Sequence, residues 1–246
     1  MPNLDMLEVC DFVNKNIVDF HQRRIYSLES LDLNKLLRKN PYLFKAKNIS
    51  TANELITGLL EAFLSSSEEK LFGDFLEELA IFIAGKIYNG HKSSAPGVDL
   101  EFFNQQIHYI VSIKSGTNWG NSSQHRKLQE DLANAVVRIK QSNYQKNVQP
   151  VLGICYGKTK TSFLRGYMKV VGQNFWYLIS GNKELYKEII EPIGYRAKEH
   201  NDSFYLEKNR VINRFTKQFL DNYCDSKGEI NWERFVEFNS GNLDLD

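Results

Sequence analysis

Residues 96–114, which read PGVDLEFFNQQIHYIVSIK, decide the fold of this chain. Two short runs rich in β-branched and aromatic residues, GVDLEFF and HYIVSIK, flank the polar segment NQQI, and this pattern predicts a β-hairpin. Side chains alternate along a strand, so Asp99 shares a face with Glu101, and Ser112 shares a face with Lys114. Because neighbouring strands of a hairpin run side by side, Asp99 and Lys114 are expected at the same end of the sheet.

The flanking segments predict helices and one further buried strand. After the hairpin, the loop SGTNWGNSS leads into a helix over about 122–141, and VLGICY is typical of a buried strand. Apolar spacing and breaking residues predict helices over 4–40, 51–64, 67–88, 183–191, 208–223 and 231–238, with Ser65–Ser67 as a stop and new N-cap and mixed structure through FWYLISG. This order predicts an α/β protein with a mixed central sheet and a helical N-terminal region.

Composition excludes several classes of protein. The 246 residues are 42% hydrophobic and 13% aromatic, which is enough to build a core. No apolar run approaches the roughly 20 residues that span a bilayer, and the acidic N-terminus MPNLDMLEVC does not resemble a secretory signal. Cys10, Cys155 and Cys224 form neither a disulfide framework nor a zinc motif, so we expect a cytoplasmic protein without membrane association.

Basic residues gather in one long segment although the net charge is only +1. From Leu132 to Lys183 there is no Asp or Glu, and the segment carries eight Lys or Arg residues. An acid-free segment of this length suggests a surface that faces a polyanion, although a chance cluster of solvated lysines remains an alternative.

An acid and a lysine at the shared end of two strands suit metal-dependent hydrolysis of a phosphodiester. The Asp99 carboxylate would hold Mg²⁺ against the scissile phosphate. The Lys114 side chain would orient or activate the attacking water, or offset the developing negative charge.

These residues resemble the motif of the PD-(D/E)xK nuclease superfamily, within it the type II restriction endonucleases. The resemblance rests on Asp99, on the strand that ends Ser112-Ile113-Lys114, and on the strings IKSGTNWGNSSQ, KNPYLFKAKNI and FGDFLEELA, and it is closest to a family that cuts degenerate GG…CC palindromes. It implies a Mg²⁺-dependent, sequence-specific endonuclease of double-stranded DNA that acts as a homodimer. The implied single domain, 1–246, comprises a helical N-terminal region (1–64), a catalytic core (65–180) and a helical C-terminal region (181–246).

One departure from the superfamily pattern concerns Ser112, which stands where the motif has Asp or Glu. Serine is a poor ligand for a hard cation, so another carboxylate is expected to join Asp99. Our candidates, in order, are Glu77, Glu101 and Glu130. Glu77 comes first because its helix face carries glycine and alanines that allow a close approach, whereas exposure of Glu77 to solvent is the alternative.

The remaining site predictions concern contacts to DNA. The loop and the start of the following helix offer neutral hydrogen-bonding groups where free backbone N–H groups favour phosphate, namely Asn118, Asn121, Ser122, Ser123 and Gln124. Ser122 is also the expected N-cap of that helix. Trp119 is expected to fill a structural role, with contact to DNA as the alternative. Beyond the next strand, Lys158, Lys160 and Arg165 are expected to lie near the DNA backbone.

Two other functions fit the same residues. A repair or junction-cleaving nuclease of the same superfamily would select DNA structure in place of a fixed sequence. A non-catalytic DNA-binding module is suggested by the serine at position 112.

Overall fold

The structure is a computed structural model that describes residues 4–142, 147–164 and 166–243. The chain forms two compact units. The sheet unit comprises Met1–Val18 and Phe72–Tyr195, and the helical unit comprises Asp19–Leu71 and Arg196–Asp246. The predicted core of 65–180 thus falls almost entirely in the sheet unit, whereas segments from both ends of the chain build the helical unit.

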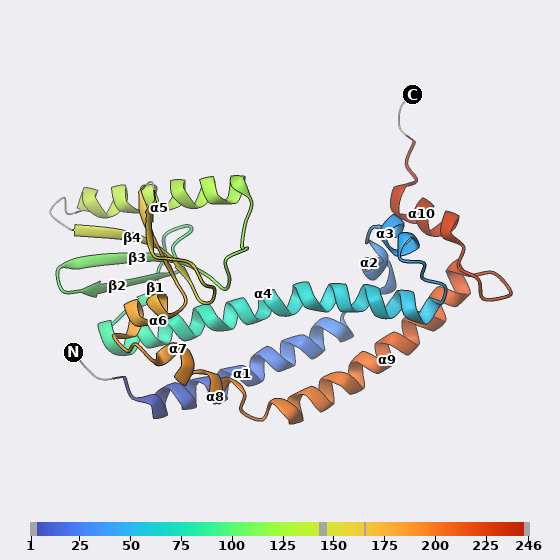
Figure 1. The fold of residues 1–246 in the computed structure, drawn as a ribbon, viewed down its shortest axis with the longest axis horizontal. Coiled ribbons are helices and arrows are strands. Elements are labelled where there is room, and N and C mark those ends of the chain that lie inside the picture. Colours follow the sequence, from blue (N-terminus) through green and yellow to red (C-terminus); the bar gives the residue numbers. More distant parts are fainter. Residues whose placement is uncertain (1–3, 143–146, 165, 244–246) are drawn as a thin grey trace. The chain divides into compact units, whose positions relative to one another are not determined.

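Helices and strands alternate in the middle of the chain and helices occupy both ends (Figure 1). The helices are α1 (Met6–Glu29), α2 (Leu33–Leu37), α3 (Pro41–Ala46), α4 (Ala52–Tyr88), α5 (Ser122–Ser142), α6 (Gln173–Ser180), α7 (Leu185–Glu188), α8 (Ile190–Ile193), α9 (Ala197–Tyr223) and α10 (Trp232–Ser240). The strands are β1 (His91–Lys92), β2 (Leu100–Asn104), β3 (Ile107–Lys114), β4 (Asn147–Ile154), β5 (Ser162–Leu164) and β6 (Tyr167–Val171).

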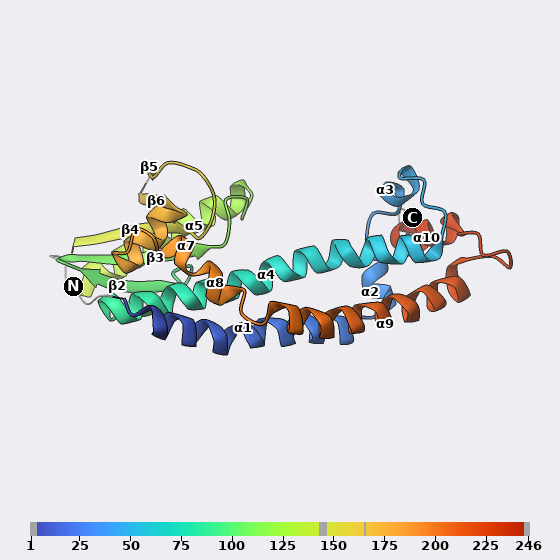
Figure 2. The ribbon, with the colours of Figure 1, turned by 60° about the horizontal axis from the view of Figure 1, so that its bottom comes forward.

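The strands form one mixed sheet in the order β1-β2-β3-β4-β6-β5. Strands β2 and β3 form the predicted antiparallel hairpin, in which Leu100 pairs with Val111 and Asn104 with Ile107. Strand β4 then runs parallel to β3, and β6 runs parallel to β4. In Figure 1 and Figure 2 strands β2, β3 and β4 lie side by side. The predicted α/β fold with a mixed central sheet is therefore confirmed.

Different helices cover the two faces of the sheet. On one face, Leu128 and Leu132 of α5 belong to the same buried cluster as Ile110 of β3 and Leu152 of β4. On the opposite face, Phe102 of β2 stacks on Tyr88 of α4, with ring centroids 5.2 Å apart. The ring of Phe175 in α6 also lies against Gly153 on that face, where an added Cβ would come within 2.3 Å of the ring.

Several predictions of local structure were wrong. The helix predicted over 4–40 is interrupted, because α1 ends at Glu29 and Asp32 caps a new helix, α2, where its Oδ1 accepts the Lys35 N–H at 2.8 Å. Helix α4 continues unbroken through Ser65–Ser67, because serine hydroxyls find partners inside and beside a helix: Ser66 Oγ donates to the Ala62 carbonyl at 3.3 Å. The FWYLISG run is largely helical, within α6, since Phe175, Trp176 and Ile179 recur at helical spacing and all three are buried.

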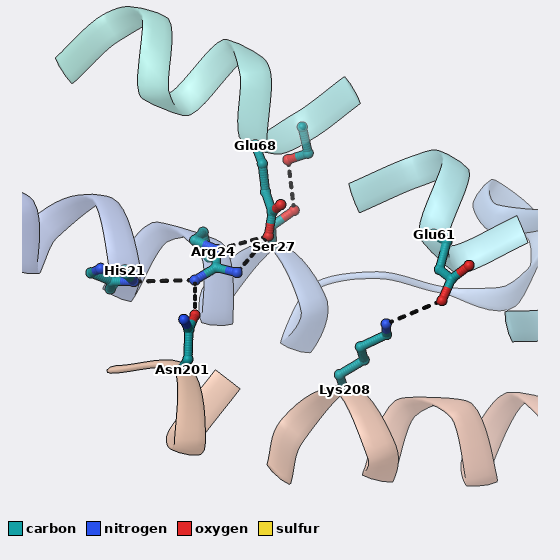
Figure 3. Close-up of polar contacts among 8 residues, drawn as sticks. His21, Arg24, Ser27, Glu61, Glu68, Asn201 and Lys208 are labelled. Atoms are coloured by element: carbon teal, nitrogen blue, oxygen red, sulfur yellow. Dashed lines mark hydrogen bonds and ion pairs between the residues drawn. The ribbon is translucent and has the colours of Figure 1, made fainter. Parts of the chain in front are cut away.

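The helical unit is built around its own apolar core, to which α2, α4, α9 and α10 contribute Leu36, Leu59, Phe215 and Phe235, among others. Beside this core lies a polar cluster around Arg24 (Figure 3). Its guanidinium group donates to Glu68 Oε1 at 2.7 Å and to Asn201 Oδ1 at 2.9 Å. Among the residues that the structure describes, no helix is long and apolar enough to cross a membrane.

Candidate active site

Asp99 lies directly before β2, at the end of the sheet where β3 finishes. Its backbone N–H donates to the Val111 carbonyl at 2.8 Å, which extends the β2–β3 register by one step. Its carboxylate oxygen Oδ2 accepts the Ile113 N–H at 2.6 Å and the Ser112 hydroxyl at 3.4 Å. These two donors hold the carboxylate at the strand end, so Ser112 helps to position the aspartate.

Lys114, the last residue of β3, reaches the same place. Its ammonium nitrogen lies 3.8 Å from Asp99 Oδ2 and donates to the Ile113 carbonyl at 2.8 Å. The same nitrogen is 5.8 Å from the centre of the Trp119 ring. The side chains of Lys114 and Asp99 keep 31% and 22% of their surface exposed, so a substrate has access to both.

Glu77 of α4 interacts electrostatically with both members of this pair. One helical turn earlier, Gly73 lies against Ser115, since a Cβ added to Gly73 would come within 3.6 Å of the Ser115 Cβ. The small residue therefore lets α4 approach the end of β3. Burial, together with the nearby negative charge of Asp99, raises the pKa of Glu77. A carboxylate whose proton affinity is raised by a second carboxylate lies where a cation is favoured.

Lys92 is the residue that sequence reasoning missed. Its ammonium nitrogen lies 3.2 Å from Glu77 Oε1, and this hydrogen bond partly offsets the rise in the pKa of Glu77. The residue belongs to β1, a strand of only two residues that pairs Lys92 with Leu100. So short a strand has no periodic pattern that could have predicted it.

The other two candidate acids lie in different surroundings. Glu101 shares the Asp99 face of β2, but its oxygens already accept from Ser93 Oγ at 2.5 Å and contact His108 Nε2 at 2.9 Å. Glu130 is exposed on α5. Glu77 therefore fits a shared cation with Asp99 better than either, and all three assignments remain predictions.

The loop after β3 starts α5 with a different cap from the expected one. Asn121, not Ser122, caps the helix: its Oδ1 accepts the backbone N–H groups of Ser123 and Gln124, both at 3.1 Å. In return, Gln124 Oε1 accepts the Asn121 N–H at 2.9 Å, which completes a capping box. Asn118 and the cap residues are exposed, whereas Trp119 is partly buried against the α5 cluster.

Two of the three basic residues that were expected near DNA belong to the described part of the chain. Lys158 and Lys160 are exposed in the loop after β4, and Arg165 lies outside the described residues.

Cys155, next to β4, is buried close enough to Glu77 and Lys114 to interact with both, and burial raises the pKa of its thiol. A buried thiol of this kind is a packing group and not a nucleophile at neutral pH.

Within the described part of the chain, no three His, Cys, Asp or Glu side chains are grouped so that they could hold a metal ion. The site therefore offers a pair of carboxylates, Asp99 and Glu77, together with the ammonium group of Lys114. Mg²⁺ usually retains several waters and is held by one or two carboxylates with substrate phosphate, so this donor set fits that ion.

Comparison with protein families matches residues 7–201 to the type II restriction endonuclease EcoO109I family. The chain belongs to this family. The match contains the whole candidate site and most of both units, so the EcoO109I family relationship makes the chain a nuclease whose substrate is DNA. No curated protein matched the chain.

Proposed function

We propose that this protein is a Mg²⁺-dependent endonuclease of the PD-(D/E)xK type that cuts double-stranded DNA at a specific sequence. The observation that carries the proposal is the approach of Lys114 Nζ to within 3.8 Å of Asp99 Oδ2 at the shared end of β2 and β3. A neighbouring helix adds Glu77 to the same place. The degenerate GG…CC palindrome suggested by the sequence remains part of this proposal.

Each residue has a separate task in the proposed reaction. Asp99 and Glu77 would hold Mg²⁺, which supplies Lewis acidity at a phosphate oxygen and a polarised water. Ser112 and the Ile113 N–H keep the Asp99 carboxylate aimed at the site, and Lys92 does the same for Glu77.

Lys114 acts on the attacking water. In the hydrolysis, the water loses a proton as its oxygen forms a bond to phosphorus, the bond from phosphorus to one ester oxygen breaks, and that oxygen takes up a proton. The Lys114 side chain, anchored on the Ile113 carbonyl, orients or activates that water or offsets the negative charge that develops on the phosphate.

A homodimer completes the proposal. A palindromic site has a twofold axis, and two copies of one chain related by a coincident axis place one active site on each strand. Both strands are then cut at equivalent positions.

The test is digestion of unmethylated plasmid DNA with Mg²⁺, followed by sequencing of the ends. Discrete fragments whose ends share one sequence support the proposal, and EDTA must abolish cutting. Cleavage only at junctions or damaged sites would instead identify a structure-selective nuclease. Binding without cleavage would identify the non-catalytic module that Ser112 suggests.

A further inference from the structure

A second basic region lies in the helical unit, whereas the residues assigned above belong to the sheet unit. From Leu33 to Asn53 the chain has no Asp or Glu and carries five basic residues, Lys35, Arg38, Lys39, Lys45 and Lys47. For a chain of net charge +1, a local excess of five positive charges is a strong asymmetry. Where the fold supplies no carboxylate partners, such an excess favours the binding of an external anion.

The five cations divide into two groups. The ammonium groups of Lys35, Lys45 and Lys47 lie over the aromatic rings of Phe63, Trp232 and Phe44, at 5.0–5.8 Å from the ring centroids. Arg38 and Lys39 form no ion pair with a carboxylate among the residues that the structure describes. These two charges are therefore available to a ligand.

Arg38 and Lys39 line a groove of about 630 Å³ between the α2–α3 turn and the end of α10. The other walls include Tyr42, Phe238, Asn239 and Ser240, and no described acidic residue lines the groove. Tyr42 and Phe238 are 62% and 39% exposed. Cations, neutral hydrogen-bonding groups and accessible rings are the set of groups that binds a nucleic-acid backbone and its sugars.

An adjoining groove of about 440 Å³ shares the Tyr42 wall but has a different charge. It is lined by Glu233 and Glu237 of α10 as well as Lys45 and Trp232. Its two carboxylates would repel phosphate, so an anionic strand is confined to the Arg38 side of Tyr42. The change from positive to negative charge at Tyr42 therefore bounds the Arg38 groove on that side.

We propose that the Arg38 groove of the helical unit binds the phosphate backbone of duplex DNA, as a second contact separate from the cleavage site. Arg38 and Lys39 each neutralise one phosphate, and Tyr42 bounds the strand. The inference rests on the proposed function for the identity of the polyanion, but it concerns binding and not hydrolysis. Such a contact is independent of base sequence and depends on salt.

The experiment measures the salt dependence of binding. The full-length chain, in EDTA to prevent cleavage, is titrated onto a labelled duplex of arbitrary sequence at several salt concentrations. We expect the double variant Arg38→Gln/Lys39→Gln to lower the slope of log K against log salt by about 1.8 for each groove that contacts the duplex, since each phosphate contact contributes about 0.9. If the two affinities are equal at 1 M salt, binding at 0.1 M is then weaker by about 60-fold for each groove.

The matched control removes the same charge elsewhere on the helical unit. Lys70 and Lys198 are exposed and do not line the groove, so Lys70→Gln/Lys198→Gln should keep the wild-type slope. An equal loss of slope in both double variants, or none in the Arg38 pair, overturns the proposal. If the double variant folds poorly, Arg38→Gln alone must lower the slope by about 0.9 for each groove that contacts the duplex, and an unchanged slope refutes the inference.

Two further outcomes separate this inference from the proposed function. A wild-type chain that cuts DNA, combined with an unaltered slope in the Arg38 variants, refutes the groove alone. A wild-type chain that binds but never cuts refutes the proposed function and leaves the slope test to decide. Sedimentation of the wild type and the Arg38 variants is measured in parallel. If the variants convert a dimer to a monomer while the salt slope stays unchanged, the groove binds a second copy of the chain, and the DNA contact is overturned.

Discussion

Asp99 makes a structural bond and a proposed catalytic contact with the same carboxylate, and two substitutions separate them. Its Oδ2 accepts the N–H of Ile113, a residue that is 4% exposed, at 2.6 Å. Asp99→Ala leaves this buried N–H without its acceptor, which costs about 1–3 kcal/mol. Asp99→Asn keeps an acceptor oxygen on a side chain of the same shape. We therefore expect the alanine variant to lose stability locally and the asparagine variant to keep it.

Hydrogen exchange at the Ile113 amide measures the structural contribution. A cost of about 1–3 kcal/mol corresponds to exchange faster by roughly 5-fold to 150-fold in Asp99→Ala, with Asp99→Asn close to the wild type. Exchange that is unchanged in the alanine variant would show that the 2.6 Å bond does not stabilise the end of β3.

Plasmid cleavage measures the catalytic contribution in the same two variants. Both lack a negative charge at position 99, so both should fall below a few per cent of the wild-type rate, since a lost metal ligand costs several kcal/mol of transition-state stabilisation. Cleavage by Asp99→Asn at more than that level refutes the assignment of Asp99 as a metal ligand. The two variants thus distinguish loss of catalysis from loss of structural stability.

Three further outcomes are expected. Lys114→Ala should abolish plasmid cleavage while the circular dichroism spectrum stays that of the wild type, and a rate near the wild type would remove this residue from the mechanism. Lys92→Met should raise the pKa of Glu77 further, because the variant removes the hydrogen bond and the positive charge that lower it, and carboxyl-carbon NMR titration detects the shift or its absence. Burial, with His200 and Arg24 beside it, lowers the pKa of His21 to about 4, below the unfolded value of 6.5. The stability that this provides is complete above pH 6.5 and falls by about 3 kcal/mol as pH drops to 4; urea unfolding of wild type and His21→Gln should diverge over that range.

The hairpin was predictable because its information is local. Alternation and the polar turn placed Asp99 and Lys114 at one sheet end, and the structure has them there with 3.8 Å between Nζ and Oδ2. The face of α4 that carries Gly73 and alanines was also predictable from spacing. In the structure Gly73 lets α4 lie close to Ser115, at the end of β3. Short-range periodicity therefore predicted the strand pair and the close approach of the helix, whereas the ranking of the acids stays a prediction.

The misses have tertiary causes. Ser66 and Ser67 suggested a break in the helix. Inside α4, however, the Ser66 hydroxyl bonds to the Ala62 carbonyl and the Ser67 hydroxyl to that of Ser27 in α1. Lys92 was missed because its strand has only two residues and depends on β2 for its pairing. Features that depend on a partner distant in the sequence leave no local pattern.

The turn that joins β2 to β3 also constrains how this gene can change length. Only Gln105 and Gln106 separate the paired residues Asn104 and Ile107, and Gln105 has the positive φ of 54° that so tight a turn uses. Inserting or deleting one residue there would slide β3 by one position and move Lys114 to the opposite face of the sheet. Variation in length is therefore expected in loops such as the one after β4. The number of residues between Asp99 and Lys114 should stay fixed.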